Sequence, residues 1–266
     1  MIRAVERAFA IFEAFDPEHT MLTLQEIGQR IGLSKATTYR LVNCVHDLGY
    51  LVRLEDNRYC LSLKLTRLSG LVRSTIGIRE IARPTMLDLV KKTGETVTLN
   101  TITANDRRLC IEVFDTPAPL MSIVREGEQQ TLLHGATGKI LLAYLSSTDF
   151  DRIFREAPAA KRPNRAVLEK QLAQYREQGY AMTSSERVPG VTAISVPLRD
   201  INGQVRYCIS ITGPAIRVDR KADAFIALLL NASKVVSGQM GARADEINDA
   251  GSKPDKKPAR QKRAVA

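Results

Sequence analysis

The fold of the N-terminal part is decided by residues 23–51, which read TLQEIGQRIGLSKATTYRLVNCVHDLGYL. Thr23 followed by Glu26 forms a capping box, in which the hydroxyl and the carboxylate each accept from a free backbone amide at the start of a helix. After a short turn, Ser34 is a strong N-cap for a second helix. Gly49 is placed at the left-handed position that closes this helix. Two helices joined by a tight turn predict a helix-turn-helix.

The helix opened by Ser34 has one apolar side, formed by Thr38, Leu41, Val42, Val45 and Leu48. Burial of that side leaves the opposite side exposed, and such a helix fits the major groove of DNA. There Lys and Arg donate to guanine, Asn pairs with adenine, and small methyl groups contact thymine. No acidic residue lies between positions 30 and 46 to repel phosphate. We therefore predict DNA contacts from Ser34, Lys35, Ala36, Thr37, Tyr39, Arg40 and Asn43.

Two β-prone runs, residues 50–54 and 58–61, flank a polar turn and predict a hairpin after this helix. The hairpin would be the wing of a winged helix, and Arg53 and Arg58 on its strands are suited to phosphates or the adjacent minor groove. An alternative is a module used for protein contact, with Arg40 merely solvated. The absence of acidic residues on the exposed helix side argues against it.

Upstream, residues 3–15 predict a first helix with an apolar stripe that must pack against another surface. The stripe consists of Val5, Ala8, Phe9, Ile11, Phe12 and Phe15.

After residue 95 the pattern changes to short alternating runs separated by helical segments. The expected strands are residues 96–102, 109–114, 121–125, 192–198 and 205–212. The expected helices are residues 138–145, 149–155, 166–178 and 218–240. Polar turns at 104–107 and 200–203 join neighbouring strands, so the pattern predicts an antiparallel sheet covered by helices. The fold class is therefore α+β, with a winged helix followed by a larger α/β domain.

The expected boundaries are 1–65 for the winged helix, 66–80 for a linker helix, 81–242 for the larger domain and 243–266 for a basic, disordered tail. The net charge of +10 is a weak argument for nucleic-acid binding, because residues 1–65 hold eight basic and eight acidic side chains. A single neutral module binds DNA weakly, so two or more copies are expected.

Composition narrows the class of protein further. The longest apolar run is too short to span a bilayer and the N-terminus lacks a signal peptide, so we expect a cytoplasmic protein without membrane contact. The four cysteines show neither zinc-site spacing nor disulfide density, and we interpret them as core residues: Cys44, Cys60, Cys110 and Cys208. With three histidines and no catalytic motif, we expect no metal, no cofactor and no enzyme activity.

The motifs resemble those of IclR-type transcription regulators in order and spacing, over nearly the whole chain except the tail. The matching segments are RAVERA at 3–8, GLSKATTYRL at 32–41, LGYL at 48–51, RYCL at 58–61, TGETV at 93–97, GK at 138–139, GYA at 179–181, residues 190–197 and ITGP at 211–214. The resemblance implies a winged helix, a linker helix and a GAF-like effector domain. It also implies homodimers or dimers of dimers (homotetramers) that bind a pseudo-palindromic promoter as repressor or activator. The implied effector is a small organic or aromatic acid.

The resemblance also places the effector site. It implies Ser210 and Thr212 as hydroxyl donors, with Ala136 and Thr137 in the loop before a helix. Hydroxyls and helix-terminal amides can hold a carboxylate there without an arginine clamp. The remaining expected pocket residues are His134, Thr183, Ala193 and Ser195. Ala193 and Thr183 replace a cysteine and an aspartate that are common in the family, so the ligand is expected to differ from those of well-known members.

Several alternatives stay open at this point. The hydroxyls of Ser210 and Thr212 have a second possible role, bonding to neighbouring backbone. His134 is open to a structural role, and strand alternation leaves undecided whether Thr192 or Ser195 faces the pocket.

As a working hypothesis, an effector shifts the helices between Leu63 and Lys92 and so changes the spacing of paired recognition helices. The alternative function is an enzyme or ligand carrier in which the winged helix merely docks.

Overall fold

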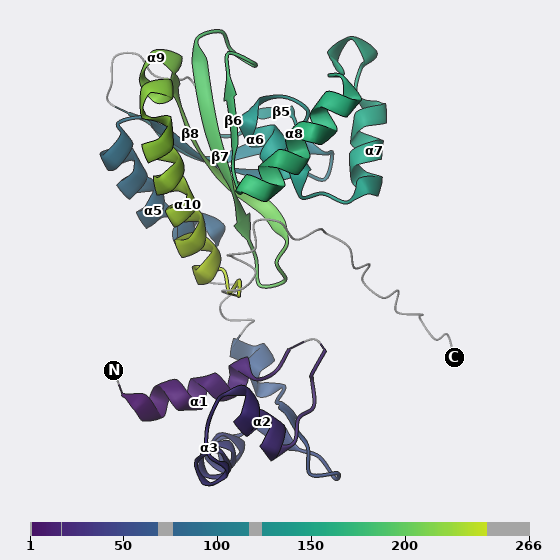
Figure 1. Ribbon diagram of the computed structural model, residues 1–266, viewed down its shortest axis with the longest axis vertical. Coiled ribbons are helices and arrows are strands. Elements are labelled where there is room, and N and C mark those ends of the chain that lie inside the picture. Colours follow the sequence, from purple (N-terminus) through teal and green to yellow (C-terminus); the bar gives the residue numbers. More distant parts are fainter. Residues whose placement is uncertain (1, 17, 69–76, 117–123, 244–266) are drawn as a thin grey trace. The chain divides into compact units, whose positions relative to one another are not determined.

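A computed structural model describes residues 2–16, 18–68, 77–116 and 124–243 of the chain. The chain forms two compact units, Met1–Gly77 and Ile78–Ala266 (Figure 1). Each unit is described by itself. The predicted linker at 66–80 lies mostly outside the described residues, as does the predicted tail after 243. Residues 64–68 are helical, and the next helix begins at Ile78.

Unit 1 is a winged helix-turn-helix. Its elements are α1 (Arg3–Glu13), α2 (Leu24–Arg30), α3 (Lys35–Asp47), β1 (Leu51–Arg53) and β2 (Tyr59–Leu61). The two strands pair as an antiparallel hairpin, and the segment before α2 joins it through two backbone bonds between Leu22 and Tyr59, at 2.9 and 2.7 Å. Its core includes Ile11, Ile27, Val42, Leu51 and Tyr59.

The predicted local signals of unit 1 are confirmed. The Thr23 amide donates to the Glu26 carboxylate at 2.7 Å, and the Glu26 amide donates back to the Thr23 hydroxyl at 3.3 Å. The Ser34 hydroxyl accepts from the Thr37 amide at 3.4 Å. Gly49, just beyond α3, has φ +78° as predicted.

Two burial predictions in unit 1 are wrong, those for Leu48 and for the cysteines Cys44 and Cys60, and the apolar stripe of α1 is buried only in part. In α1 only part of the apolar stripe is covered: Ile11 is buried, whereas Phe9 is 66% exposed and Val5 is 50% exposed. Leu48 is 57% exposed, because α3 ends at Asp47 and the chain then turns away. Cys44 is exposed and Cys60 is half-buried, so only Cys110 and Cys208 are core residues.

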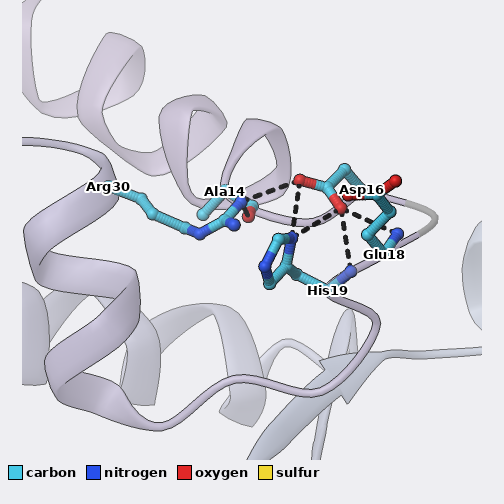
Figure 2. Close-up of polar contacts among 5 residues, drawn as sticks. All are labelled: Ala14, Asp16, Glu18, His19 and Arg30. Carbon is cyan, nitrogen blue, oxygen red and sulfur yellow. Dashed lines mark hydrogen bonds and ion pairs between the residues drawn. The ribbon is translucent and has the colours of Figure 1, made fainter.

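An ionic cluster connects the ends of α1 and α2 (Figure 2). The Arg30 guanidinium donates to the Ala14 carbonyl and to Asp16 Oδ2, both at 2.9 Å. The His19 ring Nδ1 lies 2.9 Å from Asp16 Oδ1. Arg30 pairs with the half-buried Asp16 carboxylate, so its charge adds little to the positive charge that Lys35 and Arg40 place on α3.

Unit 2 contains a six-stranded antiparallel sheet in the order β5-β4-β3-β8-β7-β6. The strands are β3 (Thr96–Ile102), β4 (Arg107–Phe114), β5 (Gln129–Thr131), β6 (Ala181–Ser184), β7 (Val191–Arg199) and β8 (Val205–Pro214). The helices are α5 (Ile78–Thr93), α6 (Gly135–Ala143), α7 (Ser147–Glu156), α8 (Arg165–Gln178), α9 (Ala215–Val218) and α10 (Ala222–Gln239). The predicted antiparallel sheet covered by helices is confirmed.

Helices cover both faces of this sheet (Figure 1). On one face, α5 and α10 enclose a core that includes Met86, Leu99, Ile209 and Leu229. On the other face, α6 and α8 enclose a second core with Ile140, Leu168 and Cys208. A strand residue therefore contributes to one core or the other according to its parity.

Some boundaries differ from the predicted ones. Residues 121–123 of the predicted strand 121–125 lie outside the described residues, and Val124 and Arg125 are not in a strand. β5 and β6 were not predicted, because each is short and lacks an apolar alternation. The predicted helix 218–240 is divided by a 3-10 turn at Asp219–Lys221.

Candidate functional site

The outer side of α3 is accessible in unit 1. Ser34, Lys35, Ala36, Tyr39 and Arg40 are exposed, whereas Thr37 and Asn43 are half-buried. Thr38, Val42 and Val45 on the opposite side are buried, with relative exposures of 0%, 0% and 5%. The predicted orientation of the helix is thus confirmed. Asp47 at the C-terminal end is the first acidic residue of α3.

Both wing arginines contact residues of their own turn. Arg53 Nη2 donates to Asn57 Oδ1 at 2.5 Å, and Arg58 pairs with Asp56 at 2.7 Å. The backbone amide and the side chain of Arg58 hold the pKa of Asp56 below its usual range. Asp56 therefore partly neutralises Arg58, while both arginine side chains remain at the surface.

Unit 2 contains a small hollow of about 40 Å³ beside the start of α6, enough for roughly three ordered water molecules. Six of the eight expected effector residues line it: His134, Ala136, Thr137, Thr183, Ala193 and Thr212. Residues that were not predicted complete the lining: Thr98, Arg108, Val124, Gly135, Gly138, Arg187, Val188 and Val191.

The other two expected residues, Ser195 and Ser210, lie beneath the hollow and do not line it. Their hydroxyl oxygens are 2.7 Å apart, and Thr137 Oγ1 is 3.2 Å from each. The three side chains form a closed hydroxyl ring between β7, β8 and α6. Ser195 thus faces α6, whereas Thr192 faces the opposite side of the sheet and donates to Asp219 at 2.7 Å. Ser210 is satisfied by side chains, not by backbone.

Two contacts fix the start of α6, one to β6 and one to the loop that follows β6. The Ala136 amide donates to Thr183 Oγ1 at 2.9 Å, so Thr183 caps the helix. The buried Lys139 ammonium lies 2.7 Å from Glu186 Oε1. His134 has partners on both ring nitrogens: Nε2 is 2.8 Å from the Lys161 carbonyl, and Nδ1 is 3.6 Å from Glu186.

Two arginines that were not predicted from the sequence, Arg108 and Arg187, also line the hollow. Arg108, on β4, is only 5% exposed. Its Nη1 donates to Asn100 Oδ1 at 2.9 Å, while its Nη2 is 3.5 Å from Glu128 Oε1 without hydrogen-bond geometry. Arg187 Nη1 donates to the same Glu128 oxygen at 3.1 Å.

Burial and charge oppose each other in this arginine pair. Burial lowers the pKa of Arg108, and the nearby Glu128 carboxylate opposes this shift. Burial raises the pKa of Glu128, but the Gln130 hydrogen bond and the two guanidinium groups outweigh it and hold the pKa below its usual range. The guanidinium groups of Arg108 and Arg187 thus share one carboxylate, that of Glu128, and this group of three side chains keeps a net positive charge.

Strand alternation is the one local signal for Arg108: it shares a face of β4 with Cys110, and that face is paired with the Asn100 side of β3. Glu128 reaches Arg108 only because β5 pairs with β4.

Two family profiles match the chain. One, described as the bacterial transcriptional regulator IclR C-terminal domain, matches residues 71–238, and the other, the IclR helix-turn-helix domain, matches residues 4–55. The chain belongs to the IclR family of bacterial transcription regulators. It is a DNA-binding regulator with an N-terminal helix-turn-helix domain and a C-terminal effector-binding domain.

Curated IclR-family relatives align along most of their length. The regulator XynR of Escherichia coli is 29% identical over 225 residues, which cover 82% of this chain and 89% of XynR. The regulator KdgR of the same organism is 29% identical over 247 residues, which cover 90% of this chain and 93% of KdgR. Both are transcription regulators by name, which supports a regulator over the alternative of an enzyme.

Solved structures share the fold. A putative IclR regulator from Silicibacter sp. TM1040 has a TM-score of 0.82 at 20% identity, covering 90% of this chain and 96% of that one. An IclR homologue from Microbacterium hydrocarbonoxydans, solved with 4-hydroxybenzoate, has a TM-score of 0.56 at 20% identity, covering 89% and 98% of the two chains.

Within the described part of the chain, no helix is long and apolar enough to cross a membrane. Nor do three potential metal ligands of the His, Cys, Asp or Glu type gather in one place there.

Proposed function

We propose that α3 reads the major groove of promoter DNA and that Lys35 and Arg40 supply its main cationic contacts. The observation that carries this proposal is the exposure of both side chains on α3, a helix whose one acidic residue, Asp47, lies at its C-terminal end. Ala36, Thr37, Tyr39 and Asn43 then face the base edges, and the Ser34 end offers backbone amides to phosphate. Arg53 and Arg58 of the wing reach the adjacent backbone.

The test is a mobility-shift titration with the promoter region next to the gene. Arg40→Ala is expected to weaken specific binding by about 1–3 kcal/mol if Arg40 contacts a base, or to lower the salt dependence by about one phosphate contact. Lys234→Ala is the matched control, because Lys234 is an exposed cation of α10 in the other unit. Equal affinity of Arg40→Ala and wild type across salt concentrations would remove α3 from the interface.

We also propose that the hollow beside α6 binds a small organic or aromatic acid that modulates promoter binding. The lining by Thr137, Thr183, Ala193 and Thr212 supports this role, as does the presence of two arginine side chains. The 4-hydroxybenzoate complex of the Microbacterium homologue supports an acid as the ligand class. His134 and Ala136 contribute a ring edge and a small side chain to the same wall, and Ser195 and Ser210 act from below through Thr137.

An effector changes promoter affinity only if it binds the DNA-bound and free conformations with different affinities. Acidic metabolites of the pathways that neighbouring genes encode would be screened by thermal shift. The acids that raise the melting temperature would then be added to the mobility-shift assay. A hit is expected to change the midpoint of the DNA titration by about 5–150-fold. Hits that stabilise the protein and leave the DNA midpoint unchanged would contradict the regulatory role of the site.

A homodimer or a dimer of dimers reading a pseudo-palindromic operator completes the proposal. Unit 1 carries eight basic and eight acidic side chains over residues 1–65, so one copy gains little from phosphate attraction. The exposed apolar side of α1 is the dimer contact we favour within this unit, because Ile2 and Phe9 are 73% and 66% exposed.

A further inference from the structure

The most unusual side chain of unit 2 is Arg108. A guanidinium that is 95% buried normally has acceptors for its donors and a close counter-charge. Here Nη1 has an acceptor in Asn100, but Nη2 has no hydrogen-bond partner. The nearest carboxylate oxygen, Glu128 Oε1, is 3.5 Å away and shared with Arg187.

The unpartnered nitrogen belongs to a residue that lines the hollow. A purely structural role does not account for a guanidinium at this position, because a neutral side chain with one N–H donor could make the hydrogen bond to Asn100. Asn100 in turn donates to Thr98 Oγ1 at 2.9 Å, and Thr98 is another lining residue. Since the Thr98 oxygen already accepts, its hydroxyl hydrogen is the group that Thr98 offers to the hollow.

We propose that Arg108 Nη2, with the Thr98 hydroxyl beside it, binds the carboxylate of a short aliphatic acid, and that Glu128 is a built-in competitor for the same guanidinium. This inference rests on the effector site proposed above and names its ligand class and its specificity-determining residue.

The size of the hollow sets the class of acid. Space for roughly three water molecules fits the three heavy atoms of a carboxylate at Arg108, so the rest of the chain must be short, with its methyl end against Val124, Val191 and Ala193. A benzene ring requires the hollow to widen. Uncharged analogues gain less, because a charge-assisted hydrogen bond is roughly twice as strong as a neutral one.

Glu128 sets the sensitivity of the site. Its carboxylate lies next to both guanidinium groups, so an incoming acid meets a like charge and a partly neutralised cation. Removing that charge while keeping the side-chain shape is therefore expected to tighten acid binding. An increase in acid affinity distinguishes the proposal from structural damage, which would lower the affinity.

The experiment measures binding of acetate, propanoate and benzoate, and of acetamide, propanamide and benzamide, to the full-length protein by ligand-observed NMR at constant ionic strength. Propanoate or acetate is expected to bind at least about tenfold more tightly than its amide. Arg108→Gln, which keeps a donor for Asn100, is expected to lose about tenfold to hundredfold in acid affinity. Arg107→Gln is the matched control, because Arg107 is exposed on the same strand.

Glu128→Gln is expected to raise acid affinity several-fold and to leave amide affinity unchanged. The proposal is overturned if no acid binds the wild type, if the amides bind as well as the acids, if Arg108→Gln retains wild-type affinity or if Glu128→Gln weakens binding. Benzoate binding more tightly than propanoate overturns the assignment of a short acid. The DNA-reading proposal is tested separately: it fails if the wild-type protein does not bind the promoter in the mobility-shift assay.

Discussion

Gly138 lies in the first turn of α6 and approaches the preceding segment closely. A Cβ atom at this position would lie 2.9 Å from the carbonyl oxygens of Thr131 and Leu132. Both are backbone atoms, so relieving the clash requires the backbone itself to shift. We expect Gly138→Ala to cost about 1–3 kcal/mol of stability, as overpacking does in other proteins, measured by denaturant unfolding of the full chain.

Gly238 provides the matched control, because it lies in α10 with nothing within 4 Å of an added Cβ. Gly238→Ala is expected to leave stability unchanged or to raise it by roughly 0.5–1 kcal/mol through helix propensity. Equal effects of the two substitutions would contradict the packing account of Gly138.

Residues whose role depends on near neighbours could be predicted from the sequence. The Thr23 and Ser34 caps act within one helical turn, and the structure confirms both. Arg108 and Glu128 are twenty positions apart, and only the pairing of β4 with β5 brings them together. No spacing rule contains that information, which is why the charged part of the hollow was missed.

At the scale of elements, Asp16 connects α1 to α2 (Figure 2). The Arg30 guanidinium, and after it His19, holds the pKa of Asp16 well below its usual range. A carboxyl with a lowered pKa in the folded state contributes stability above its ordinary pKa near 4, and this contribution declines as the pH falls. Asp16→Asn is therefore expected to destabilise unit 1 at pH 7 and to reduce its loss of stability on acidification.

Hydrogen exchange of the α2 and α3 amides at pH 7 and pH 4 measures this effect within unit 1. Glu55→Gln is the control, since Glu55 is an exposed carboxylate of the wing turn. If Asp16→Asn leaves protection unchanged at pH 7, the cluster contributes nothing to the docking of α1 on α2.

In the wing, loss of a carboxylate is predicted to strengthen promoter binding. Asp56 pairs with Arg58, so the carboxylate lowers the positive potential where the wing would meet DNA. Asp56→Asn keeps an acceptor for the Arg58 amide and removes the charge. We expect a several-fold higher promoter affinity in the mobility-shift assay, larger than that of Glu55→Gln, which removes the same charge beside it. Equal gains would show that only net charge matters.

Elements with a strong apolar period were predictable, and short polar ones were not. β3 matches its predicted range, Thr96–Ile102, because both of its faces are covered and its ends are marked by turns. β5 and β6 are edge strands of three and four residues with mixed side chains. Sheet pairing, not local propensity, makes these two segments strands.

At the scale of the whole molecule, the exposed side of α1 bears on assembly. Ile2, Val5 and Phe9 form a stripe that the described residues of unit 1 leave largely exposed. Phe9→Ser is expected to shift the protein toward smaller species in sedimentation velocity and to weaken promoter binding, because two coupled modules bind more tightly than one.

Arg7→Ser is the control on the same helix, since it exchanges a polar exposed side chain for another. A Phe9→Ser protein that sediments like the wild type would place the dimer contact elsewhere in the chain.

The closed ring of Thr137, Ser195 and Ser210 has a consequence of its own. Each hydroxyl can give one hydrogen and accept one, so the ring allows the three hydrogens to point around it in either of two senses. A molecule in the hollow that takes the hydrogen of Thr137 breaks the circuit at that corner. The two serines can still donate along the open chain toward Thr137, but one of them no longer accepts a hydrogen bond, so the interior of the sheet registers whether the hollow is filled.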